Sequence, residues 1–191
     1  AGAGAADYVK ALKGKAPEVS DDAVEDAHDH LNAPFTRDGS ENPYTLHQEL
    51  QQITQDLVGI IRTESELKDA LKKLEVIRER SKKAKATGGK AFNPSFHLAI
   101  DLENMLLVSE SIARSALQRE ESRGGHTRED FPKMDPTWRQ VNSITTWSGD
   151  SMNVVKEPLP SMPKELATLF DVEELKKYLT ESELANYGGA K

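Results

Sequence analysis

The strongest hydrophobic pattern in the chain lies in residues 93–132. Apolar residues recur there at steps of three, four and seven, which is the spacing of one face of an α-helix. Pro94 suits the first turn of such a helix, and Gly124 and Gly125 suit its end. The pattern predicts one long central helix, whose apolar face consists of Leu98, Leu102, Met105, Ile112 and Ala116, widened by Ala99, Leu106, Ala113 and Leu117.

Two shorter helical patterns precede this long one. The first continues from Leu46 to Leu57 and is extended by Ile60 and Ile61, and the second follows the capping candidate Thr63. Short connections favour antiparallel neighbours, so residues 44–122 predict an up-down-up, spectrin-repeat-like three-helix bundle. Its predicted core is Leu46, Leu50, Ile53, Leu57, Leu67, Leu71, Leu74, Leu98, Leu102, Met105 and Ile112.

The region before the bundle predicts two helices. Residues 1–12 are alanine-rich and lack an initiator methionine, so we expect them to end an element that begins elsewhere. Ser20 is the predicted N-cap of a helix over residues 21–31, and proline and glycine make residues 32–43 a loop.

The region after the bundle predicts a hairpin and a strap. Residues 138–147 and 152–155 read as strands around a turn at 148–150. An extended strap through Pro158, Pro160 and Pro163 should follow, with short helices over residues 163–170 and 172–187. The fold class is therefore mainly α, divided into a lead-in (1–42), the bundle (43–123) and a loop, hairpin and strap packed on it (124–191).

Composition limits the possible functions. The chain has 191 residues, 37% of them hydrophobic and 30% charged, with a net charge of -7 and no cysteine. An acidic chain does not favour nucleic-acid binding, and the absence of cysteine removes thiolate and iron–sulfur chemistry. With a mean hydropathy of -0.63, the chain contains no apolar run long enough to insert into a membrane.

Two clusters of charged or histidine residues suggest ligands only weakly. His28 and His30 lie two apart, about 200° around a helix, which does not suit one-sided metal ligation, so we expect no metal site. Residues 68–90 hold nine Lys/Arg against three Asp/Glu but no aromatic residue before Phe92, so a solvated helix face is favoured over a polyanion site.

The loop at residues 120–132 has the density of charge and glycine typical of a functional site. Three interpretations stay open. Arg123 and Arg128 suit an anion site, His126 with Asp130 or Glu129 suits acid–base chemistry, and interlocking ion pairs would pin the loop to a neighbouring surface. No serine–histidine–acid arrangement or phosphate-binding loop accompanies it, so we predict no catalytic residue in this chain.

This loop and the helix before it closely resemble the C-terminal helical region of succinate dehydrogenase and fumarate reductase flavoproteins. The family has a serine-arginine-glycine-alanine-histidine loop followed by arginine, aspartate and proline, and Gly125 stands where that family usually has alanine. The matching residues here are Ser122, Arg123, Gly124, His126, Arg128, Asp130 and Pro132.

The resemblance implies that a parent flavoprotein carries FAD and interconverts succinate and fumarate. This chain then buttresses the FAD-binding and capping domains of the same polypeptide and contacts an iron–sulfur subunit, at the cytoplasmic, inner face of a membrane. The chain itself should bind no cofactor, because the dinucleotide fingerprint and the family's substrate residues lie outside it. The predicted interdomain docking loop is Ser122, Arg123, Gly124, His126, Arg128 and Asp130, with Arg123, His126 and Arg128 exposed to anions.

Two alternatives remain at this point. L-aspartate oxidase and related flavoproteins carry a similar helical domain, and an independent helical scaffold or anion-binding module would also fit the residues.

Overall fold

The computed structural model describes residues 1–15, 18–149, 151–160, 163–167 and 169–176, together with residues 181 and 184. It divides into two compact units, Ala1–Met134 and Asp135–Lys191. The first unit is helical and the second contains an antiparallel hairpin, which confirms the predicted mainly helical fold class with a C-terminal hairpin.

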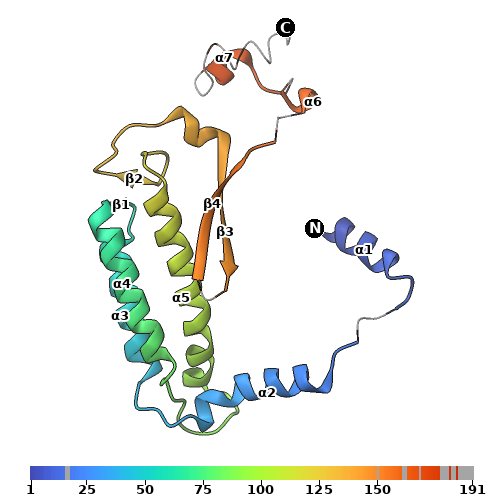
Figure 1. The fold of residues 1–191 in the computed structure, drawn as a ribbon, viewed down its shortest axis with the longest axis vertical. Coiled ribbons are helices and arrows are strands. Elements are labelled where there is room, and N and C mark those ends of the chain that lie inside the picture. Colours follow the sequence, from blue (N-terminus) through green and yellow to red (C-terminus); the bar gives the residue numbers. More distant parts are fainter. Residues whose placement is uncertain are drawn as a thin grey trace. The chain divides into compact units, whose positions relative to one another are not determined.

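Three helices form the centre of the first unit. In Figure 1, α3 (Pro43–Leu57), α4 (Glu64–Ser81) and α5 (Pro94–Gln118) lie side by side, with α4 running opposite to the other two. Each of the three contacts the other two. The predicted up-down-up bundle is confirmed.

The core of the bundle follows the predicted stripes on α3 and α4 and a shifted stripe on α5. Ile112 was predicted to be buried, but it is 49% exposed, because the neighbouring Ala113 faces α3 and α4 instead. Ile60 and Ile61 are also exposed, so they do not extend the apolar face. The buried cluster is Leu46, Leu50, Leu67, Leu74, Ile77, Ala84, Leu102, Leu106, Ala113 and Ala116, with Ile53, Leu71 and Met105 partly buried against it.

Side-chain caps set where the three helices begin. At the start of α4, the Glu66 amide donates to the Thr63 hydroxyl (3.3 Å) and the Thr63 amide donates to the Glu66 carboxylate (2.7 Å). This is the predicted capping box. Asn42 and Asn93 cap α3 and α5 with their side-chain oxygens, which accept from the Tyr44 and Phe96 amides. At the other ends, α5 stops at Gln118, several residues before the glycine pair, and α4 stops at residue 81 rather than near residue 87.

The N-terminal region contains α1 (Gly2–Ala11) and α2 (Asp21–Thr36). Ser20 caps α2 as predicted, but α2 passes through Pro34 instead of ending at residue 31. Proline usually breaks a helix because it lacks an N–H. Here Pro34 is buried and its carbonyl accepts from the Ala86 amide at 2.8 Å, so a contact from outside the helix holds the end of α2.

The second unit begins with the 3-10 helix η1 (Pro136–Gln140), which leads into β3 (Val141–Ser148) and β4 (Ser151–Pro158). The predicted hairpin is confirmed, but Trp138 lies in η1 instead of the first strand, and Pro158 pairs with Val141 instead of starting a strap. Lys156 lies 3.6 Å from the centre of the Trp138 ring. Two short helices follow, α6 (Lys164–Ala167) and α7 (Val172–Lys176), and most of the predicted extension to residue 187 lies outside the described residues.

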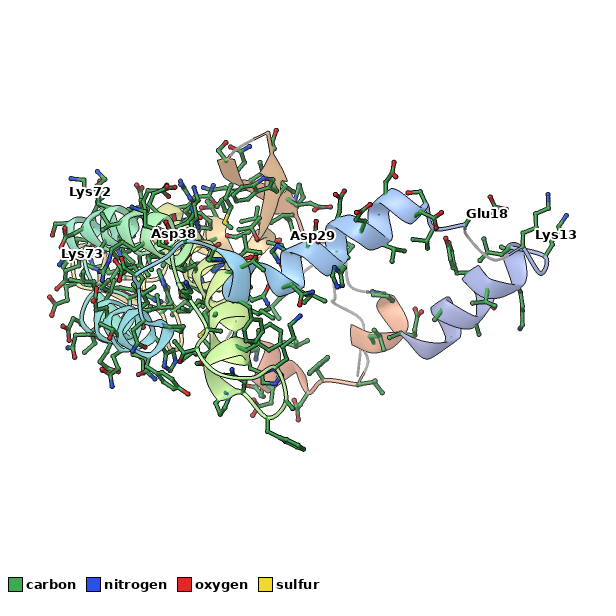
Figure 2. The ribbon with its side chains drawn as sticks, turned by 90° about the horizontal axis from the view of Figure 1, so that it is seen from below. Lys13, Glu18, Asp29, Asp38, Lys72 and Lys73 are labelled. Atoms are coloured by element: carbon green, nitrogen blue, oxygen red, sulfur yellow. The ribbon has the colours of Figure 1, made fainter. Side chains whose placement is uncertain are left out.

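The outer surface of α4 carries the basic residues noted in the sequence. Figure 2 shows Lys72 and Lys73 pointing away from the bundle, and Lys73 pairs with Asp69 at 2.8 Å one turn earlier. These positions fit a solvated helix face. No helix in the described part of the chain is long and apolar enough to cross a membrane.

Candidate functional site

A tight turn forms the tip of the loop that follows α5. The Arg123 amide donates to the His126 carbonyl (2.7 Å) and the His126 amide donates to the Arg123 carbonyl (3.0 Å). Gly124 has φ +58, a backbone conformation that favours glycine. A Cβ at Gly125 would meet no atom within 4 Å, and its φ is not in that region, so the alanine of the family pattern fits this turn.

A short parallel strand pair ties the loop to the segment between α3 and α4. It joins β1 (Ile61–Arg62) to β2 (Thr127–Arg128), with the Thr127 amide donating to Ile60 and the Glu129 amide donating to Arg62. Two-residue strands have no periodic signal, so the sequence did not predict this pair. The pairing places the loop in the same unit as the bundle.

Arg128 is the centre of the loop, and its side chain is 1% exposed. Its Nη1 donates to the carbonyls of Ala116 (2.9 Å), Leu117 (3.2 Å) and Arg119 (3.4 Å). The last carbonyls of a helix have no partner within the helix and carry partial negative charge. The guanidinium therefore caps the C-terminus of α5, and this cap allows the helix to end before the glycine pair.

Asp130 occupies the other side of the same guanidinium. Arg128 donates from Nε to Oδ1 and from Nη2 to Oδ2, both at 2.8 Å. The Glu64 amide, in the first turn of α4, also donates to Oδ2 at 2.8 Å. The hydrogen bonds from Arg128 are the main reason that the pKa of Asp130 is lowered to about 2. Arg128 and Asp130 therefore link the C-terminus of α5 to the N-terminus of α4.

Ser122 and Phe131 hold this pair in place. The Ser122 hydroxyl accepts from the Arg128 amide at 2.8 Å and donates to the Phe131 carbonyl at 2.8 Å. The Phe131 ring lies 4.9 Å from the guanidinium carbon of Arg128, which is within the range of a cation–π contact.

Glu121 forms a second buried ion cluster on the same loop. Its side chain is fully buried and accepts from Nε and Nη2 of Arg123, both at 3.0 Å. Arg119 approaches the same carboxylate at 3.4 Å. A buried carboxylate requires such partners, because isolated charge is costly in the interior.

His126 and Arg62 form the third part of the site. Arg62 Nη2 donates to His126 Nδ1 at 2.9 Å, so His126 Nε2 carries the proton and donates to the Arg119 carbonyl at 2.9 Å. Burial is the main cause that lowers the pKa of His126, and Arg62, Arg119 and Arg128 lower it further. His126 is therefore a neutral hydrogen-bonding bridge.

The structure decides among the three interpretations of the loop. The prediction that Arg128 is exposed to anions is wrong, and Arg123 and His126 are only partly exposed. Asp130 is the partner of Arg128 as predicted, but His126 bonds to Arg62 and a carbonyl instead of an acid, so the acid–base pair is not formed. Interlocking ion pairs describe the loop best. Sequence reasoning missed Glu121 and Arg62, although Glu121 stands two residues from an arginine on either side.

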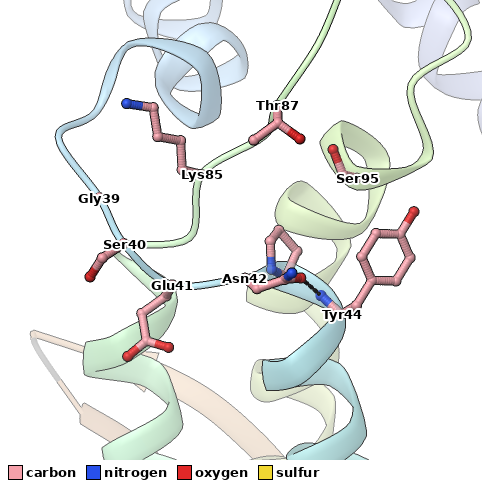
Figure 3. Close-up of a pocket in the computed structure, with 9 residues that line it drawn as sticks. Gly39, Ser40, Glu41, Asn42, Tyr44, Lys85, Thr87 and Ser95 are labelled. Atoms are coloured by element: carbon pink, nitrogen blue, oxygen red, sulfur yellow. Dashed lines mark hydrogen bonds between the residues drawn. The ribbon is translucent and has the colours of Figure 1, made fainter.

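A cavity of about 250 Å³ lies at the opposite end of the bundle. Figure 3 shows it between the loop before α3, the loop after α4 and the first turn of α5. Its lining combines hydroxyl groups with Lys85 and Glu41, and the Glu41 carboxylate binds Arg80. His28 and His30 lie on α2, and no group of three residues able to hold a metal ion occurs in the described part of the chain.

The fold and the loop define a class of protein, a helical bundle domain in which a buried arginine and its partner aspartate link the ends of two helices. The family model for the fumarate reductase flavoprotein C-terminus matches residues 47–169, so the chain belongs to that family. It is the C-terminal domain of a flavoprotein of the succinate dehydrogenase or fumarate reductase type.

Solved structures and curated relatives agree with this membership. The Mycobacterium smegmatis Sdh1 complex in the apo form contains a chain that is 50% identical, with a TM-score of 0.86 over 97% of this chain and 32% of that one. The E. coli quinol fumarate reductase gives 25% identity and a TM-score of 0.66 over 77% of this chain and 27% of that one. The succinate dehydrogenase flavoprotein of Coxiella burnetii is 38% identical over 96 residues, 50% of this chain and 16% of that protein. The chain thus spans about a third or less of the length of these relatives.

Proposed function

We propose that the protein containing this domain interconverts succinate and fumarate with bound FAD, and that the domain braces the FAD-binding domain. Family membership supports the proposal, because relatives that share this domain are named as flavoproteins of fumarate reductase or succinate dehydrogenase. In the proposed arrangement, residues 1–42 are the connection to the FAD-binding domain and residues 43–123 are the brace. The hairpin and strap within residues 124–191 pack on that brace.

The observation that best supports the bracing role is that all the donor nitrogens of the Arg128 guanidinium are used within this domain. Every nitrogen of the Arg128 guanidinium donates to a carbonyl or carboxylate of the same unit, and the pair fixes two helix ends at once. A group used in this way is not available for substrate. It gives the loop a fixed shape, and its tip at Gly124 and Gly125 is exposed for contact with another domain.

The proposed partners are the FAD-binding and capping domains of the same polypeptide and an iron–sulfur subunit. The docking loop would be Ser122, Arg123, Gly124, His126, Arg128 and Asp130. Its buried residue Arg128 would fix the shape of the exposed tip at Gly124. The similar M. smegmatis chain belongs to the Sdh1 complex, which supports a place for this domain in a larger assembly. We further propose that this assembly lies at the cytoplasmic, inner face of a membrane.

Two arginine variants of the full-length flavoprotein test the bracing role. We expect Arg128→Ala to lower flavin content and succinate-dependent dye reduction, because the loop loses its shape. Arg80→Ala, a change in the partly exposed network at the other end of the bundle, is the matched control and should leave both near the wild-type level. Full flavin content and activity in the Arg128 variant would contradict the bracing role.

A titration tests the absence of a cofactor site in this chain. FAD, succinate and fumarate added to the 191-residue chain should produce no heat and no spectral change. Binding of FAD at micromolar concentration would contradict the assignment of cofactor and substrate binding to the rest of the parent.

A further inference from the structure

The strand pair that anchors the loop is an incomplete sheet. It consists of two parallel strands, and each is only two residues long. Parallel sheets are normally covered on both faces, and two strands alone are marginal in water. Yet Ile60 and Ile61 at this pair are 68% and 62% exposed. The face of β1 that carries Ile61 is therefore uncovered, whereas Arg62 on the other face is buried.

One edge of β1 is open. The carbonyls of Ile60 and Arg62 accept from the β2 segment, and successive residues of a strand point their backbone groups to opposite sides. The N–H and C=O of Ile61 therefore point away from β2. No residue in the described part of the chain hydrogen-bonds to either group. An open edge of this kind is a template for a further strand.

The charge beside this edge is incompletely paired. Arg62 is 9% exposed, and its Nη1 and Nη2 donate to the Val58 carbonyl (3.1 Å) and to His126. Its Nε is buried without an acceptor, and no carboxylate of the described residues pairs with it. Two acids of the same loop, Glu121 and Asp130, are already held by other arginines. A buried cation without a counter-ion favours a partner that brings negative charge.

We propose that the outer edge of β1 takes a third strand from the parent flavoprotein. The strand would be an extended apolar segment with one acidic side chain near Arg62. Its source would be the part of the polypeptide that this chain does not include, since the similar M. smegmatis chain matches 97% of this chain within 32% of its own length. The inference rests on the proposed function and names the contact through which the domain docks. Strand addition supplies main-chain hydrogen bonds at Ile61 and covers both exposed isoleucines.

Amide hydrogen exchange at Ile61 is the direct test. In the 191-residue chain this amide should exchange at nearly the rate of an unstructured peptide, and in the full-length flavoprotein it should exchange about 100-fold more slowly. If Ile61 stays unprotected while other surfaces of the domain gain protection, the edge is not the contact but docking still occurs. If no surface of the domain gains protection, the proposed bracing role fails as well.

Hydrogen exchange at Ile61 also tests whether a second copy of this chain occupies the edge of β1. Protection of Ile61 that appears in the 191-residue chain and rises with its concentration would mean that a second copy takes the edge, which would overturn the proposal.

Ile61→Pro provides an independent variant. Proline lacks the N–H that the third strand needs, and that N–H is not used in the pairing with β2, so proline is tolerated on this edge. We expect the melting temperature of the 191-residue chain to change by no more than about 1 °C. The full-length protein should release flavin about tenfold faster, because strand hydrogen bonds are lost.

Val76→Lys is the matched control, because Val76 is 57% exposed on α4 and lies away from β1. It should leave flavin release within about twofold of the wild type. Equal flavin release in the Ile61→Pro protein and in this control would also overturn the proposal.

Discussion

Two arginines close opposite ends of the bundle, and they do so in different surroundings. Arg128 caps the C-terminus of α5 with a side chain that is 1% exposed, and it binds Asp130 through two parallel hydrogen bonds. Arg80 lies in the last turn of α4, is 33% exposed, and binds Glu41 and Glu49 of the α3 region. Arg80 joins α4 to the α3 region through two carboxylates, whereas Arg128 binds carbonyls of α5 and reaches α4 through the Asp130 carboxylate.

The two arginines differ in whether water could hydrogen-bond to the groups that each would leave behind if it were removed. If Arg80 is removed, its partly exposed partners can be solvated at once. If Arg128 is removed, three carbonyls at the end of α5 lose a donor in a site that water reaches poorly. The same ion-pair chemistry therefore contributes differently to stability, because truncating a buried partner leaves polar groups without hydrogen bonds.

Arg128→Ala should cause the largest loss of stability in the 191-residue chain. Breaking a buried ion pair costs about 3–5 kcal/mol, and the partial exposure of Asp130 places the expected loss near the lower end. Urea unfolding would measure it. The sequence analysis took Arg128 to be exposed, and an exposed ion pair contributes only about 0–1 kcal/mol.

Arg80→Ala is the other half of this comparison and should cost only about 0–1 kcal/mol, with a smaller effect at high salt. Similar losses in the two variants would show that burial does not separate the two networks.

Leu102→Ala calibrates the comparison against ordinary core packing. Leu102 is fully buried, and removing a buried leucine side chain costs about 2–5 kcal/mol. Ile112→Ala is the control on the same helix, because Ile112 is half exposed and its truncation should cost less than about 1 kcal/mol. Chemical denaturation measures both. If the two variants lose equal stability, the buried stripe of α5 is misplaced.

Acid should weaken the Arg128 end through Asp130. The pKa of this group is lowered from 3.8 to about 2 in the folded chain, so its contribution is complete above pH 3.8. As the pH falls from 3.8 toward 2, the unfolded chain binds the proton first and the contribution is lost. The slope of unfolding free energy against pH in this window should be smaller in Asp130→Asn. An unchanged slope would mean that other acids cause the acid sensitivity.

Substitutions in the glycine pair of the loop should change the stability least, and in opposite directions. Gly124→Ala places a side chain at φ +58 and should cost about 1 kcal/mol. Gly125→Ala meets open space at a permitted φ and should stabilise the chain by about 0.4–1 kcal/mol, because it restricts the unfolded state. Melting curves of the two single variants check this, and effects of the same sign would contradict the turn geometry.

The sequence by itself determined the elements with strong local signals. The bundle helices α3, α4 and α5 follow from apolar spacing, and the capping box at Thr63 follows from a four-residue motif. The hairpin follows from β-branched residues around a turn. These features depend on residues a few positions apart, and such spacing is visible in a single chain.

Only the tertiary structure decided the ends of the helices and the chemistry of the loop. Helix α2 continues through Pro34, whose carbonyl accepts from the distant Ala86 amide, and α5 ends at Gln118 because Arg128 supplies the cap. Whether Arg128 binds anions from solution or closes a helix depends on its burial, which spacing does not encode. The pairing of Arg62 with His126 joins residues 64 positions apart, and such a contact exists only once the bundle has brought β1 beside β2.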